Sequence, residues 1–294
     1  SPSSNESAEV NYLHTEIRDD WRVQSFTGLM NESQRLQPHT LLSHSVSPAL
    51  SEAITIFGFP KGSRAGTFLH TLFESIVFET AEPISPLTSQ FSDLEELIHS
   101  KLKLSKLVEE ELIPQWASYL QRWIKSVLAY SLNTGIKLGD LKESDYVSEM
   151  SFYYSIEHLN AKRFNTLLQR HGYAASNIEF GPFKGHMKGA IDLIFKAKGQ
   201  YFILDYKSNY LGCEKDDYHL SALENVMDEH RYDVQYLLYT LATHRYLKHR
   251  LGEAYDYERD FGGVYYLFLR GLSIGEEYTE GHKEEYDEDI FIDG

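Results

Sequence analysis

Residues 190–212 read AIDLIFKAKGQYFILDYKSNYLG, two apolar runs separated by a short polar turn. Each run carries one aspartate at its middle, Asp192 and Asp205, and the second run adds Lys207 two residues later. Apolar runs of this length on both sides of a Lys198-Gly199 pair are typical of a β-hairpin with a two-residue turn. The sequence therefore predicts two neighbouring strands that each hold a carboxylate among core residues.

The register of this hairpin follows from its turn. If Lys198-Gly199 is the loop, Ala197 opposes Gln200, and the same register places Asp192 directly opposite Asp205. Side chains in such a pair have Cβ atoms about 4.5–5.5 Å apart. Because strand side chains alternate, Lys207 shares the face of Asp205. The opposite face is predicted to enter the core and to consist of Ile191, Leu193, Phe195, Phe202, Leu204 and Tyr206.

Two facing carboxylates in an apolar sheet repel each other and are costly to desolvate. Three arrangements would make them tolerable: a shared proton, a salt bridge to Lys207, or a divalent cation. Oxygen ligands held this close suit Mg²⁺ or Ca²⁺. A cation with an open position activates water, and a nearby ammonium offsets developing charge, so the pattern also fits a phosphodiesterase centre.

Periodicity places this hairpin inside a mixed α/β chain. A strand-like segment starts at residue 21, and residues 31–63 are expected to be irregular. Helices are predicted at 65–78 (ended by Pro83 and Pro86), 93–104, 107–132 (interrupted at Pro114), 159–173, 218–230 and 232–251, and further strands at 146–156 and 262–271. The core order is helix, strand, strand, strand, helix, strand, which predicts a mixed sheet with helices on both faces.

Composition limits the possible classes of protein. The 294 residues allow one large domain or two small ones, and the single cysteine, Cys213, excludes an internal disulfide and indicates a reducing compartment such as the cytoplasm. The net charge of −16 argues against broad electrostatic binding to nucleic acid, although half of it, −8, lies in residues 275–294. We expect a polar linker at 1–20, cut from a longer protein, one folded domain at 21–274 and an acidic tail at 275–294.

Four further side chains are candidates for the same site, and each could instead have an ordinary structural role. His70 lies at the edge of the apolar stripe of helix 65–78 and either packs or supplies a third metal ligand. Glu149 alternates with apolar neighbours and either faces water or adds a third carboxylate. Gln235 and Tyr239, one helical turn apart, either pack or hydrogen-bond the lysine or a phosphate.

A basic cluster near the end of helix 232–251 contains Arg245, Lys248 and Arg250. It suits either the helix dipole or a phosphate contact, and the sequence does not separate the two.

Several motifs together resemble a known family. The hairpin GAIDLIFKAKGQYFILDYKSNYLG resembles the nuclease motif of the RecB-type β-subunit of exonuclease V, a bacterial helicase–nuclease of the PD-(D/E)xK restriction-endonuclease-like superfamily. The likeness continues, in the same order, through WRVQSFTGL, GTFLHTLFE, HRYDVQYLLYTLATHRYLKHRL and DYERDFGGVYYLFLRG. It covers most of residues 21–271 and implies an αβββαβ core, which agrees with the order above.

The resemblance also implies roles for particular residues. Three side chains and one main-chain carbonyl would be metal ligands, namely His70, Asp192, Asp205 and the carbonyl of Tyr206. Lys207 would be the catalytic lysine. Glu149 matches a glutamate that the family needs for cleavage, and would hold a second cation or an ordered water. Gln235 and Tyr239 match the family's Q-x-x-x-Y element.

The implied function is a Mg²⁺-dependent DNA nuclease, with Ca²⁺ or Mn²⁺ as possible substitutes. The resemblance implies an upstream helicase in the same chain, RecC- and RecD-like subunits and RecA as partners. The alternative is a nuclease-like fold kept as a non-catalytic interaction module, which has no reason to retain all five polar residues His70, Glu149, Asp192, Asp205 and Lys207. An RNA-directed nuclease of the same fold is a third, weaker option.

Overall fold

The structure is a computed structural model that describes residues 21–36, 54–84, 91–171, 178–272, 274 and 291–293. The predicted linker at 1–20 lies outside these residues, and so does the predicted acidic tail apart from 291–293. No helix in the described part combines the length and apolar character that crossing a bilayer requires.

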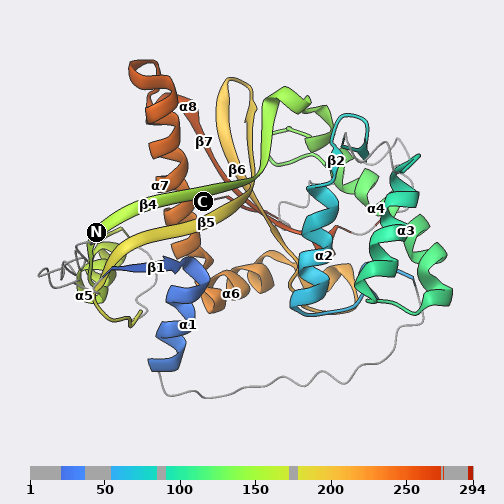
Figure 1. The fold of residues 1–294 in the computed structure, drawn as a ribbon, viewed down its shortest axis with the longest axis horizontal. Coiled ribbons are helices and arrows are strands. Elements are labelled where there is room, and N and C mark those ends of the chain that lie inside the picture. The colour runs from blue at the N-terminus through green and yellow to red at the C-terminus, as the bar shows by residue number, and fades with distance from the viewer. Residues whose placement is uncertain are drawn as a thin grey trace, which may run out of the picture.

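A six-stranded mixed sheet forms the centre of the molecule (Figure 1). Its strands are β1 (Arg22–Ser25), β4 (Tyr146–Leu159), β5 (Phe183–Ala197), β6 (Gln200–Lys207), β7 (Phe261–Phe268) and β8 (Phe291–Asp293). With helices α2 (Ser63–Phe73) and α7 (Tyr232–Leu251), the order is α2, β4, β5, β6, α7, β7. The predicted αβββαβ core is confirmed.

The hairpin register is confirmed as far as the strands pair. Ala197 opposes Gln200 and Leu193 opposes Leu204, with Lys198 and Gly199 as the turn. Both turn residues have positive φ, 50° and 84°, as a type I′ turn requires.

The buried face of the hairpin matches the prediction with one exception. Five of the six predicted apolar residues join one core cluster: Leu193, Phe195, Phe202, Leu204 and Tyr206. The prediction for Ile191 is wrong, because it packs in a second cluster with Ile194 and Ile203. Regular pairing is interrupted at Asp192, between Ile191 and Leu193, so simple alternation does not carry across that position.

The sheet divides along β5, and this division positions the candidate site. One edge of β5 pairs with β4 along its length, whereas the other edge pairs first with β1, up to Lys188, and then with β6, from Leu193 onward. Between these two partners the edge is open, and Asp192 lies there. β6 continues alone against β7, where Asp205 pairs with Tyr266 in parallel. The strands therefore separate at the two aspartates.

Helices cover the sheet on both sides, as predicted. Helices α2, α3 (Leu94–Ser105) and α4 (Ile113–Ala129) gather on one side, and α6 (Leu220–His230) and α7 lie behind the sheet in Figure 1. Two helices, α1 (Phe26–Leu36) and α5 (Ala161–Arg170), pack with the start of α7 in a third cluster. The smaller described elements are β2 (Ile76–Val77), β3 (Glu82–Pro83) and α8 (Tyr257–Asp260).

Three predicted boundaries are corrected. The helix predicted for 107–132 with an interruption at Pro114 begins only at Ile113, because proline is accepted in the first turn of a helix. The helix predicted for 65–78 ends at Phe73, since Ile76 and Val77 are β-branched and pair with β3 in a small hairpin. The segment expected to be irregular from residue 31 begins inside α1, which runs on to Leu36.

Candidate active site

Three acids stand in a row across three strands. The neighbours of Glu149 on β4 pair with the neighbours of Asp192 on β5, so these two acids face each other. The β5–β6 pairing ends at Leu193 and Leu204, and Asp205 lies just beyond it, close enough for the Asp192 charge to raise its pKa. Glu149 has a φ of 51°, in the left-handed region that a non-glycine residue rarely adopts. Such strained backbone is frequent at functional sites.

Asp205 and Lys207 form a buried ion pair with two helical partners. Lys207 Nζ lies 2.6 Å from Asp205 Oδ2 and donates to Gln235 Oε1 at 2.6 Å. Gln235 Nε2 donates in turn to Asp205 Oδ1 at 3.1 Å and to the Tyr239 hydroxyl at 3.0 Å. The structure thus brings these four predicted residues together, on two strand positions and one face of α7. The salt bridge to Lys207, one of the three arrangements considered above, is present.

Aromatic rings complete the surroundings of Lys207. Its ammonium lies 3.6 Å from the centre of the Tyr232 ring and 5.0 Å from that of Tyr266. Burial raises the pKa of Asp205, and the Lys207 charge partly opposes that rise. The lysine is therefore held by a carboxylate, an amide and two rings.

Asp192 lies at the open edge of β5, between α2 and β6. Its Oδ2 accepts the backbone N–H of Tyr206 at 2.7 Å and lies 3.4 Å from His70 Nδ1. Helix α2 reaches this position because Gly66 packs against Ser208, just past β6; a Cβ on Gly66 would lie 2.6 Å from the Ser208 hydroxyl. Burial by itself lowers the pKa of His70, but the hydrogen bond and charge of Asp192 bring it above the ordinary value.

The sequence prediction did not include Glu74. This residue lies one helical turn after His70, at the C-terminal end of α2, and its charge acts on Glu149. Burial raises the pKa of Glu74, and burial together with the Glu74 and Asp192 charges raises that of Glu149 to about 7. The spacing of four residues from His70 was the available signal, because it places both side chains on one face of the helix.

The charge balance of this cluster favours a bound cation. Four carboxyl groups, those of Glu74, Glu149, Asp192 and Asp205, are gathered around one buried ammonium and one imidazole, with Lys101 beside Glu74. Oxygen donors with one imidazole suit a divalent cation. As they stand in the described residues, no three such side chains converge closely enough to hold an ion. Asp205 is turned onto Lys207 and Asp192 onto Tyr206 N, so binding requires the Asp205 carboxylate to turn toward Asp192.

The comparisons with known proteins agree with this geometry. The profile of the PD-(D/E)XK nuclease superfamily matches residues 54–291, most of the chain. This chain belongs to the PD-(D/E)XK nuclease superfamily. Asp192 and Asp205-Tyr206-Lys207 have the residue types of the acid and of the acid-x-lysine in that name.

Individual relatives are RecB subunits. The chain is 40% identical to the RecBCD enzyme subunit RecB of Escherichia coli (strain K12) over 265 residues, 86% of this chain and 21% of that protein. It is 36% identical to the RecB subunit of Haemophilus influenzae over 281 residues, 87% of this chain and 22% of the relative. The chain spans about a fifth of the length of these relatives.

Nucleases of the PD-(D/E)XK superfamily generally use divalent metal ions. In this chain the donors available for such an ion are the imidazole of His70 and the carboxylates of the row, with Glu74 beside them. The Tyr206 carbonyl remains a predicted ligand, next to the N–H that Asp192 fixes.

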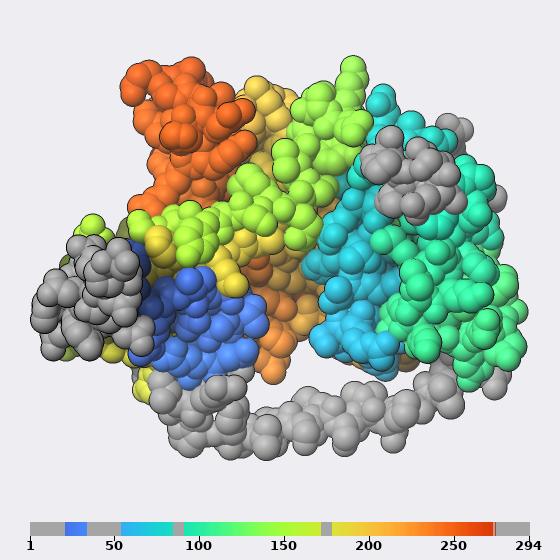
Figure 2. Space-filling view, in the orientation of Figure 1, coloured from blue at the N-terminus to red at the C-terminus, as the bar shows by residue number. Residues whose placement is uncertain are grey.

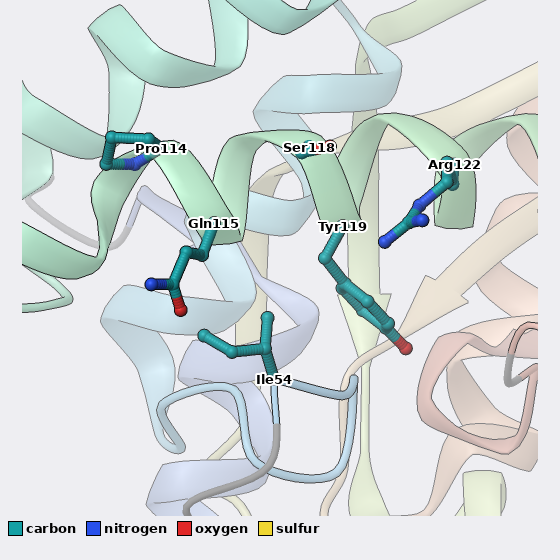
Figure 3. A pocket seen from close by; sticks show the side chains of 6 residues that line it. All are labelled: Ile54, Pro114, Gln115, Ser118, Tyr119 and Arg122. Carbon is teal, nitrogen blue, oxygen red and sulfur yellow. The ribbon is translucent and has the colours of Figure 1, made fainter.

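A pocket of about 480 Å³ lies elsewhere, along α4 (Figure 3). It is lined by Ile54, Pro114, Gln115, Ser118, Tyr119 and Arg122. None of these residues belongs to the acid row, so we assign it no part in the nuclease site.

The raised pKa of Glu149 predicts how the metal-free protein responds to pH. The folded state holds a proton up to about pH 7 that the unfolded chain releases near 4.5, so this stabilisation is complete below 4.5 and lost as the pH rises through 7. We expect Glu149→Gln, which keeps the shape without titrating, to lose less thermal stability between pH 4.5 and 7.5 than the unmodified protein. Calorimetry in a chelator measures this.

The dependence of thermal stability on pH should be weaker in Glu149→Gln but should not vanish, because the pKa of Glu74 and that of Asp205 are raised as well. Equal losses of melting temperature in both proteins would show that Glu149 does not hold the proton.

Proposed function

We propose that this chain is a Mg²⁺-dependent deoxyribonuclease that hydrolyses phosphodiester bonds of DNA strands during the processing of DNA ends in recombinational repair. The observation that carries the proposal is the acid row Glu149–Asp192–Asp205 with Lys207 held beside it. Family membership and similarity to RecB subunits support the reaction class and the DNA substrate.

The proposed chemistry assigns each group one task. His70, Asp192, Asp205 and the Tyr206 carbonyl would hold the cation, which supplies charge for the scissile phosphate and lowers the pKa of a bound water. Glu149, near Glu74, would hold a second cation or an ordered water. Lys207 would orient the attacking water and offset the negative charge that develops on the phosphate.

Gln235 and Tyr239 act through their neighbours in this proposal. Gln235 bridges Lys207 and Asp205 with both ends of its amide, and Tyr239 accepts its second N–H. Gln235 would remain a partner of the ammonium if the Asp205 carboxylate were engaged by a cation. The pair therefore positions Lys207 for the reaction.

Partners are proposed from the relatives alone. Their names place them in the RecBCD enzyme, so we propose RecC- and RecD-like subunits for the protein to which this chain belongs. A helicase in the same chain that feeds single strands to this site, and a role in loading RecA, are further parts of the same proposal.

The test is a cleavage assay on the purified chain. Labelled single-stranded DNA, duplex DNA and RNA are incubated with Mg²⁺, Ca²⁺, Mn²⁺ or chelator, and Asp192→Asn is the matched variant. We expect DNA degradation that needs Mg²⁺ or Mn²⁺, stops in chelator, and falls at least about a hundredfold in Asp192→Asn.

Two outcomes would contradict the proposal. DNA left intact with every divalent ion, for both proteins, would favour the non-catalytic interaction module. Preferential degradation of RNA in a mixture of both substrates would favour the RNA-directed nuclease.

A further inference from the structure

The side of β4 that carries Glu149 remains open along the strand. Every second residue from Glu149 to Glu157 is exposed, whereas the residues between them are half-buried. The facing positions of β5, from Lys184 to Asp192, are likewise the less buried ones. On the side seen in Figure 2, β4 crosses the front of the molecule, with β1 and α1 in blue below it. No described helix covers this side of β4.

An aromatic group occupies the far end of this face. Tyr153 of β4 stacks on His186 of β5 with ring centres 4.5 Å apart and planes at 21°, and Trp21, just before β1, lies 5.2 Å from the same imidazole. Tyr153 is 59% exposed and Trp21 50% exposed. Two large rings thus present much of their surface to solvent, which a structural role does not require.

Between the acid row and Glu157, the charged side chains on this face are lysines. Lys188 is exposed and pairs across the ladder with Tyr153, and the Lys184 ammonium lies 5.5 Å from the centre of the Trp21 ring. The nearest acid along β4 in this direction is Glu157, beyond Ser155. In a chain with a net charge of −16, the part of the face between Glu157 and the acid row thus carries two lysines, three rings and no acid.

This aromatic face, defined by Trp21, Tyr153, Lys184, His186 and Lys188, is continuous with the acid row. Tyr153 lies four residues from Glu149 on the same side of β4, and Lys188 lies four residues from Asp192 on β5. Four residues of strand correspond to about 13 Å. A strand of nucleic acid on the aromatic face therefore leads directly to the three carboxylates.

We propose that the aromatic face binds single-stranded DNA and guides it to the acid row. Exposed rings stack on bases of any sequence, and neighbouring lysines track the phosphates, which is how single strands are held without base readout. Duplex DNA would not offer the faces of its bases to these rings. The inference rests on the proposed nuclease function and specifies the form of its substrate.

The test uses the fluorescence of Trp21. The other two tryptophans, Trp116 and Trp123, are 5% and 0% exposed, so stacking on the aromatic face should quench only Trp21. We expect oligo(dT) of about 15 nucleotides, added in chelator so that no cleavage occurs, to quench the emission. Trp21→Phe should abolish the quenching and retain the affinity, measured with a labelled strand.

Variants then test the surface itself. Trp21→Ala and Tyr153→Ala should each weaken binding about tenfold. Lys184→Gln and Lys188→Gln should each reduce the dependence of binding on salt by about one phosphate contact. Tyr246→Ala is the control, since Tyr246 is another exposed ring, 42%, on α7 and away from this face. It should bind as the unmodified protein does.

The outcomes separate this inference from the function on which it rests. Unchanged DNA affinity in Trp21→Ala and Tyr153→Ala, with normal cleavage by the unmodified protein, would contradict DNA binding by the aromatic face but not the proposed nuclease function. The face would then be available to a protein. A higher KM of the alanine variants for long strands, with unchanged cleavage of a dinucleotide-sized substrate, would support DNA binding by the aromatic face. Failure of the unmodified protein both to cleave and to bind would remove the function and the inference together.

Discussion

Lys207→Met should lower the rate of DNA cleavage about a thousandfold while leaving DNA binding nearly unchanged. The ammonium lies 2.6 Å from Asp205 and is the only lysine in direct contact with the acid row among the described residues. Removing a group that stabilises developing charge costs about 10²–10³ in rate, and loss of water orientation adds to that. Single-turnover cleavage with saturating protein measures the chemical step.

Lys196→Met is the matched control, because Lys196 is an exposed lysine near the turn of the same hairpin. It should cleave at the normal rate. The substitution of Lys207 also leaves Asp205 buried without its charged partner, which destabilises the fold. Equal melting temperatures in the presence of Ca²⁺ would show that the loss is chemical. A rate within tenfold of normal in Lys207→Met would show that the lysine has only a structural role, in its ion pair with Asp205.

Arg270→Met should destabilise the protein by about 3–5 kcal/mol, the largest structural effect that we expect. Arg270 is 1% exposed, and its guanidinium donates to the backbone carbonyls of Ile56 and Phe59 at 2.7 and 3.1 Å. It also reaches Pro60 O at 2.6 Å and Ser208 O at 3.1 Å. Methionine fills the space but leaves these carbonyls without donors. Urea unfolding measures the change.

This arginine connects the loop before α2 to the end of β6. Its loss should therefore also loosen the approach of α2 to β6 and weaken metal binding, through the position of His70. Arg259→Met is the control: Arg259 pairs only with Asp260 and a carbonyl at the surface, and no measurable change is expected. A loss below about 1 kcal/mol for Arg270→Met would mean that water satisfies the carbonyls.

The local parts of the fold and site were predictable from sequence. The hairpin register was predictable because a two-residue turn sets which residues face each other, and Leu193 indeed opposes Leu204. Helix α7 begins and ends at the predicted residues, 232 and 251, and it brings Gln235 to Lys207 as considered from spacing. These features depend on residues close together in the chain.

Features that depend on distant segments were not predictable from patterns. Glu74 at the end of α2 lies near enough to act on Glu149 of β4, and the ring of Tyr266 reaches Lys207 from β7. The interruption of the ladder at Asp192, which turned Ile191 away from its predicted cluster, arises because β5 exchanges one neighbour for another. No periodicity in a single segment encodes such an exchange.

The central claim is that the acid row shares a divalent cation. A crystal of the protein soaked in Mn²⁺ tests it most directly, because the anomalous signal locates the ion without ambiguity. We predict a peak within coordination distance of His70, Asp192 and Asp205, with the Asp205 carboxylate turned from Lys207 toward the ion. Crystals without a peak there at saturating Mn²⁺, in which the Asp205–Lys207 bond persists, would contradict the account.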